Sequence, residues 1–113
     1  MKTVKIISML LLLIGLTFSA KAADKVTIQL KWVTQAQFAG YYVAKDKGFY
    51  RDEGLNVTIK PGGPDIAPQQ VLAGGGADVI IDWMPSALAA REKGSPVVNI
   101  AQIFNRSGMM LTC

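Results

Sequence analysis

The chain has 113 residues, with twelve lysine and arginine residues against eight aspartate and glutamate residues and a formal net charge of +4. Three of the basic residues lie within the first 22 positions, so the rest of the chain is close to neutral and gives no support for nucleic acid as a partner. There is no histidine, and the single cysteine is Cys113. An intrachain disulfide, a histidine-containing zinc site and a histidine-based catalytic triad are therefore excluded.

Residues 1–22 have the pattern of a cleaved signal peptide. A positive head with Lys2 and Lys5 precedes an apolar run over residues 6–18, and Ala20-Lys21-Ala22 places small side chains at the positions that a signal peptidase reads. The run of about 13 residues is short of the roughly 20 that a membrane-spanning helix needs. An uncleaved N-terminal helix is the alternative, but no second apolar span accompanies it. We expect a mature, soluble protein that begins at Ala23 in a periplasm-like space.

Strand and helix patterns alternate through the first half of the mature chain. Residues 26–32 predict a strand, and residues 37–47 predict a helix that ends at Gly48, where a left-handed residue is required. A polar turn at residues 51–54 leads into a second strand at Leu55–Lys60, where apolar and polar residues alternate.

The alternation continues after the loop Pro61-Gly62-Gly63-Pro64. Asp65 is predicted to be the N-cap of a short helix, because an aspartate side chain accepts the free N–H groups of a helix start. The glycine clusters predict turns, because no lysine and hydroxyl follow them in P-loop order. The elements predicted in this half are a helix at 65–73, a strand at 77–81 that ends before Asp82, a helix at 85–93, a fourth strand at 97–104 and the beginning of a fifth at Met109.

This order of elements predicts an α/β fold. Strands and helices that alternate with short connections favour right-handed crossovers, and hence a mostly parallel sheet with helices on both faces. Residues 23–113 would form one lobe. The apolar residues Met109, Met110 and Leu111 near the end are unusual for a finished domain, so we expect the lobe to be incomplete.

The candidate ligand-binding residues lie in the loops that follow the predicted strands. Ligands of open parallel sheets bind beyond the carboxyl ends of the strands, where loops and helix N-termini converge. Two tryptophans there, Trp32 and Trp83, offer stacking faces for a flat ring. The polar groups that could bind the edge of such a ring are Gln35, Gln37, Asp82 and Asn105.

Each of these residues also has a purely structural explanation. A tryptophan that follows a strand is often part of the core. Asp82 lies just before Pro85 and is equally suited to capping the helix that begins there. Arg106, in the loop after the fourth strand, fits a solvated surface charge. The ring-binding role of the tryptophans and of Asp82 therefore stays one of two alternatives at this point.

Five blocks of the mature chain follow one another in a characteristic order: Leu30-Lys31-Trp32, residues 38–45, Gly48-Phe49-Tyr50, residues 53–57 and Gly76-Ala77-Asp78-Val79. Together they resemble the N-terminal lobe of the type II substrate-binding proteins of ABC importers. The branch that the chain most resembles binds thiamine pyrimidine precursors and is related to the eukaryotic thiamine pyrimidine synthases. The resemblance extends over essentially the whole mature chain.

The resemblance implies the solute-binding component of an ABC importer. Such a protein would capture a small aromatic heterocycle of the hydroxymethylpyrimidine type in the periplasm, act as a monomer with a membrane permease, and use no cofactor or metal. Binders of nitrate, sulfonate and riboflavin are similar in this lobe, so these ligands remain alternatives. Carried over by position, five residues would face the cleft between two lobes: Trp32, Gln37, Asp82, Trp83 and Met84.

A synthase-like enzyme of thiamine biosynthesis is the second hypothesis. The resemblance implies that synthase chemistry uses histidine, a lysine-bound pyridoxal cofactor and a cysteine-rich iron motif, whereas this chain has no histidine and one cysteine. Its mature lysines fit helix-terminal or surface charges, so we expect no enzymatic activity. The family members have two lobes, and this chain ends before any crossover to the second one. One wall of the binding cleft would then be missing.

Overall fold

The computed structural model describes residues 22–104. The predicted signal peptide up to Lys21, the predicted strand at Met109, and Asn105 and Arg106 lie outside the described residues. The elements in chain order are β1 (Asp24–Gln29), the 3-10 helix η1 (Ala36–Phe38), α2 (Ala39–Asp46), α3 (Phe49–Asp52), β2 (Leu55–Lys60), α4 (Pro68–Ala73), β3 (Val79–Ile80) and α5 (Met84–Glu92).

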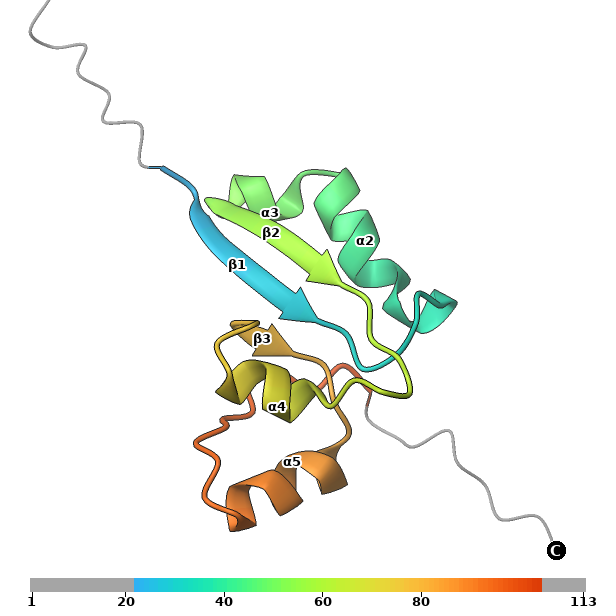
Figure 1. Cartoon of the computed structure of the whole chain (residues 1–113). Coiled ribbons are helices and arrows are strands. Elements are labelled where there is room, and N and C mark those ends of the chain that lie inside the picture. Colours follow the sequence, from blue (N-terminus) through green and yellow to red (C-terminus); the bar gives the residue numbers. More distant parts are fainter. Residues whose placement is uncertain (1–21, 105–113) are drawn as a thin grey trace, which may run out of the picture.

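The three strands form one parallel sheet with β1 in the centre, in the order β2-β1-β3 (Figure 1). Strand β1 pairs with β2 along its whole length, from Asp24 opposite Leu55 to Gln29 opposite Lys60. It pairs with the two-residue β3 only near its end, where Ile28 lies opposite Val79. All three strands therefore end at the same edge of the sheet, and the α/β fold class is confirmed.

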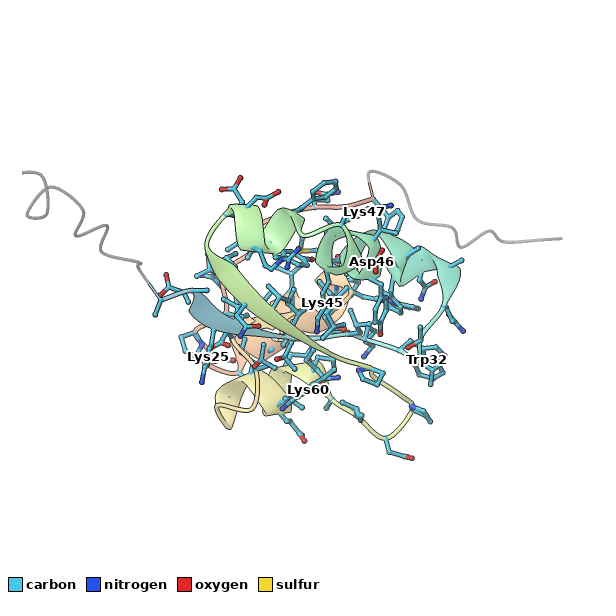
Figure 2. The ribbon with its side chains drawn as sticks, turned by 90° about the horizontal axis from the view of Figure 1, so that it is seen from above. Lys25, Trp32, Lys45, Asp46, Lys47 and Lys60 are labelled. Atoms are coloured by element: carbon cyan, nitrogen blue, oxygen red, sulfur yellow. The ribbon has the colours of Figure 1, made fainter. Side chains whose placement is uncertain are left out.

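The helices lie on either side of the strands. Figure 2 shows α2 and α3 above the strands and α4 below them. Helices α2 and α3 contact β2, while α4 contacts β3. Because β2 and β3 flank β1 on opposite sides, right-handed crossovers place the two connections on opposite faces of the sheet.

The buried core gathers around the end of β1. Ile28, Leu30, Phe38 and Val57 form the buried cluster, and Leu30 is fully buried. Consecutive residues of β1 are buried because a central parallel strand is covered on both faces. Partly buried apolar and aromatic residues surround this cluster: Val26, Tyr41, Tyr42, Tyr50, Leu55, Ile59, Val79 and Ile81.

The loops that leave β1 and β2 are held together by their backbones. Gly62 N donates a hydrogen bond to the carbonyl oxygen of Trp32 at 2.9 Å. A Cβ atom at Gly62 would lie 2.3 Å from the carbonyl oxygen of Leu30, so only glycine fits there. The buried Gln29 side chain reinforces the crossing, because its Nε2 donates to the carbonyl oxygens of Leu30 (3.1 Å) and Pro61 (2.9 Å).

Several boundaries agree with the sequence predictions. Strand β2 has the predicted bounds, and Gly48 adopts the predicted left-handed conformation with φ 83°. Other boundaries differ: the first strand covers Asp24–Gln29 rather than 26–32, and the third covers Val79–Ile80 rather than 77–81. A short helix, α3, occupies part of the predicted polar turn, and Asp65 is not a helix N-cap. Ala67 holds that place with extended backbone, because the residue before Pro68 is disfavoured in the helical region and Pro68 itself suits the first helical position.

The predicted fourth strand at residues 97–104 is also wrong. This segment has no strand structure, and Val98 and Ile100 are 75% and 76% exposed. A strand requires a hydrogen-bonded neighbour, and among residues 22–104 no other strand lies beside this segment. Within the same range, no helix has the length and apolar character needed to cross a membrane.

We predict that Gly62→Ala lowers the free energy of unfolding by about 3 kcal/mol, because the new methyl group forces two loop backbones apart. Gly63→Ala is the matched control. No atom lies within 4 Å of a Cβ built at Gly63, so its free energy should change by less than about 1 kcal/mol. Urea denaturation of both variants measures the difference, and equal stabilities would contradict the close approach at Gly62.

The two tyrosines beside the core predict a loss of stability at alkaline pH. Burial and the neighbouring Tyr50 raise the pKa of Tyr41 above 10.0, and burial raises the pKa of Tyr50. The unfolded chain therefore releases these phenolic protons at lower pH than the native one. Their contribution is fully present below about pH 10 and is lost as the pH rises through the higher native pKa. Denaturation midpoints between about pH 9 and 12 should fall less steeply for Tyr41→Phe than for the wild type.

Candidate functional site

The carboxyl edge of the sheet brings together three loops that are distant in sequence. Because the strands are parallel, residues 30–35 after β1, 61–67 after β2 and 81–83 after β3 leave from this one edge. The crossing at Gly62 already joins the first two loops. The sequence-predicted site residues lie in these loops or at the helix starts that follow them, so the edge is the candidate site.

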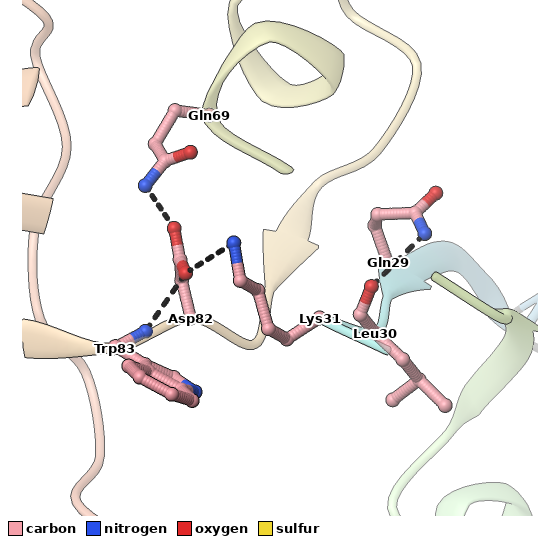
Figure 3. A network of polar contacts seen from close by, with 6 residues as sticks. All are labelled: Gln29, Leu30, Lys31, Gln69, Asp82 and Trp83. Carbon is pink, nitrogen blue, oxygen red and sulfur yellow. Dashed lines mark hydrogen bonds and ion pairs between the residues drawn. The ribbon is translucent and has the colours of Figure 1, made fainter. Parts of the chain in front are cut away.

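A polar cluster joins the loop after β3 to the loop after β1 and to α4 (Figure 3). Lys31 Nζ lies 3.3 Å from Asp82 Oδ1, and Gln69 Nε2 donates a hydrogen bond to Asp82 Oδ2. Asp82 Oδ1 also accepts the backbone N–H of Trp83 at 2.8 Å. The side chain of Asp82 is only 3% exposed, so these contacts replace the water that a carboxylate requires. We call Lys31, Gln69 and Asp82 the clasp.

The clasp corrects two interpretations of the sequence. Asp82 is not the N-cap of α5: Trp83 holds that position and its side chain forms no capping hydrogen bond, while Asp82 accepts the N–H of Trp83 itself. Lys31 is not a simple surface charge, since its ammonium group is the counter-charge of a buried carboxylate. A sequence signal for this pair exists, because Lys31 and Asp82 carry opposite charges, one within the last two residues of a predicted strand and the other directly after a second predicted strand. Gln69 had no such signal, because its position depends on where α4 begins.

Both tryptophans follow members of the clasp directly and lie at the surface. Trp32 is 38% exposed and Trp83 is 60% exposed, and neither belongs to the buried core. The alternative that they serve as core residues is therefore wrong. Figure 2 shows Trp32 at the periphery of the fold, beyond the end of β1. The indole rings are available for contact with another molecule, and their contact with a ligand stays a prediction.

The other two predicted residues are exposed at helix starts. Gln37 lies in η1, after the loop that carries Trp32. Met84 is the first residue of α5 and is 46% exposed. Within residues 22–104 neither side chain forms a hydrogen bond with an indole, so their place in a ligand site is also a prediction.

The two cavities found among the described residues lie away from the tryptophans. One, of about 240 Å³, lies among α2, α3 and β2 and is lined by Lys45, Tyr50 and Arg51. The other, of about 420 Å³, lies between α4 and α5 and includes Gln69 and Lys93. Neither of these cavities within residues 22–104 is lined by Trp32 or Trp83. Within these residues no three histidine, cysteine or acidic side chains are grouped for a metal ion.

We predict that Lys31→Met lowers the free energy of unfolding by about 2 kcal/mol, because it leaves the buried Asp82 carboxylate without its counter-charge. The double variant Lys31→Met with Asp82→Asn should recover part of this loss, because no unpaired charge remains. Lys25→Met, at an exposed lysine of β1, should change the stability by less than about 0.5 kcal/mol. Chemical denaturation of the wild type, Lys31→Met, Asp82→Asn and the double variant completes the cycle, and strictly additive losses would contradict a direct interaction.

Comparisons with known proteins bear on this site. Residues 35–113 match the family model described as NMT1/THI5 like. The formylaminopyrimidine-binding protein of Halalkalibacterium halodurans is 34% identical over 110 residues, which cover 91% of this chain and 33% of that relative. The 4-amino-5-hydroxymethyl-2-methylpyrimidine phosphate synthase THI11 of Saccharomyces cerevisiae is 27% identical over 85 residues, which cover 74% of this chain and 25% of the synthase.

A third relative extends the second group. The 4-amino-5-hydroxymethyl-2-methylpyrimidine phosphate synthase of Aspergillus parasiticus is 28% identical over 85 residues, again 74% of this chain and 25% of the synthase. The chain thus spans a quarter to a third of the length of these relatives. The chain includes the candidate edge. The match of the family model begins at Gln35 and includes α5. The chain belongs to the NMT1/THI5-like family.

Proposed function

We propose that the protein is the exported solute-binding component of an ABC importer and captures a small heterocycle of the pyrimidine type. The observation that carries the proposal is the pair of exposed indoles, Trp32 and Trp83, on loops that the clasp joins. A flat ring is bound well by aromatic faces, and a solvent-exposed indole gains by covering such a ring. The likeness to a formylaminopyrimidine-binding protein supports a pyrimidine as the ring.

The binding step uses stacking and edge contacts rather than bond chemistry. Trp32 and Trp83 would contact the faces or edges of the ring, and Met84 would add a polarisable sulfur beside it. Gln37 would read the ring nitrogens or an exocyclic amine, since an amide both donates and accepts. The chain covers a third of its binding-protein relative, so a second wall of the cleft would come from outside these residues. Closure of two walls excludes water and raises affinity.

Export and transfer complete the proposal. Residues 1–22 would direct the protein across the inner membrane and be removed, so that the mature protein works in the periplasm as a monomer. A membrane permease would then receive the ligand from the closed form. No cofactor or metal enters this scheme.

A pyrimidine-forming enzyme is the competing function, because two of the relatives described above are synthases. The absence of histidine from the chain argues against synthase-type chemistry here. Incubation of the natural-length protein, meaning the gene product as the cell makes it, with pyridoxal phosphate separates the two hypotheses. A binding protein shows no stoichiometric imine absorbance, whereas such a band at a single lysine would favour the enzyme.

Calorimetry on the natural-length protein tests the binding role. We expect heat of binding with a formylaminopyrimidine or an aminopyrimidine, and none with nitrate, taurine or riboflavin. Trp83→Ala should weaken the binding by about 10- to 100-fold, because one stacking face is lost. Phe49→Ala, which removes an exposed aromatic of α3 away from the carboxyl edge, should leave the affinity within about twofold.

Two results would contradict the proposal. If nitrate or a sulfonate binds and the pyrimidines give no heat, the ligand is an oxyanion and ring stacking is not the basis of recognition. If Trp83→Ala and Phe49→Ala have the same affinity for the pyrimidine as the unmodified protein, the ligand binds elsewhere on the molecule.

A further inference from the structure

We propose that the clasp is a positioning device: the Lys31–Asp82–Gln69 cluster sets the relative placement of the two indole-bearing loops and thereby the affinity for the ring, without touching the ligand. The proposal rests on the function proposed above. It assigns Lys31 and Gln69 a role, and it assigns Asp82 a role different from direct contact with the ring.

The first step of the argument is that the carboxylate of Asp82 is buried and already has three partners within the protein. Oδ1 faces Lys31 Nζ at 3.3 Å and accepts the Trp83 N–H at 2.8 Å, while Oδ2 accepts from Gln69. With 3% of its side chain exposed, the carboxylate lies beneath the surface that the indoles present. A ligand could reach it only by displacing these partners, at the cost of an unpaired buried charge.

The second step is that the clasp acts at the bases of both tryptophans. Lys31 and Asp82 are the residues immediately before Trp32 and Trp83. The ion pair between them therefore links the two loops at the residue that precedes each tryptophan. Each tryptophan backbone is also held directly, since Trp83 N donates to Asp82 and the Trp32 carbonyl accepts from Gly62. The rings themselves stay 38% and 60% exposed. The arrangement fixes the bases of the rings and leaves their faces free.

The third step is that, within residues 22–104, the backbone pairing of β1 with β3 ends before the indoles. Strands β1 and β3 pair at two positions only, and the last backbone bond between them runs from Ile81 N to Gln29 O at 2.9 Å. Beyond Ile81 the clasp continues the connection through side chains (Figure 3). Loss of the clasp would let two platforms move independently, and a ligand would then have to order them on binding.

A double-mutant cycle with two readouts tests the proposal on the natural-length protein. Lys31→Met, Asp82→Asn and their combination are titrated with a formylaminopyrimidine, and each protein is also labelled with fluorotryptophan. Fluorine signals of the two indoles are assigned through Trp32→Phe and Trp83→Phe. Each single variant should weaken binding by roughly tenfold, and the double variant should be no weaker than the worse single variant. Both indole signals should shift or broaden in the ligand-free variants.

Two further variants separate positioning from simple stability. Lys25→Met controls for loss of a lysine on β1 and should change neither the affinity nor the fluorine signals. Gln69→Met removes one hydrogen bond and keeps the ion pair, so it tests the clasp if the charge variants fail to fold. Its expected effects are a smaller loss of affinity and a shift of the Trp83 signal, while the protein remains as folded as the wild type by circular dichroism.

The outcomes distinguish this inference from the function on which it rests. If the unmodified protein binds the pyrimidine and the clasp variants retain both its affinity and its indole signals, the positioning role is overturned and the function stands. If the effects of Lys31→Met and Asp82→Asn on the affinity multiply in the double variant, Lys31 and Asp82 act independently and the clasp is likewise overturned. Absence of pyrimidine binding in the unmodified protein overturns the function alone, because the fluorine signals report on the clasp without ligand.

Discussion

The central position of β1 determines where every other feature of the molecule lies. Both edges of this strand are occupied by parallel partners, its last residues Ile28 and Gln29 are buried, and its end lies beside the ends of β2 and β3. Three loops that are far apart along the chain therefore begin side by side. Leu30, fully buried, is the last residue of this strand region before the polar edge begins. The transition from core to candidate site takes place within two residues, Leu30 and Lys31.

The edge depends on packing and on charge in different ways. At Gly62 the backbones of two loops come so close that there is no room for a side chain, so the crossing requires glycine. At Asp82 the loops are joined by a charge whose removal from water is compensated by Lys31, Gln69 and a backbone N–H. The first contact holds the backbone of Trp32 through its carbonyl oxygen, and the second holds the backbone of Trp83 through its N–H. In the proposed function, these two contacts together define one wall of a ring-binding cleft.

Local patterns predicted most of the fold, and contacts between distant residues explain what they missed. The alternation in Leu55–Lys60 and the left-handed requirement at Gly48 are local, and both predictions are confirmed. Residues 97–104 also have a strand-like composition, but a strand depends on a neighbour that local sequence does not supply. At the site, the sequence left open whether the tryptophans are core residues or surface residues, and their exposure decides for the surface. The partnership of Gln69 with Asp82 depends on where α4 begins, and its N-cap is Ala67, two residues after the predicted Asp65.

The unpaired stretch after α5 has a practical consequence for laboratory work on this segment. Four large apolar side chains in this stretch are each at least 60% exposed to water: Val98, Ile100, Ile103 and Phe104. Exposed apolar patches of this kind bind chaperones, adsorb to plastic surfaces and associate with other copies of the same chain. Concentrated samples of residues 22–104 alone would therefore aggregate, and a soluble fusion partner placed after Phe104 or a mild detergent would counteract this.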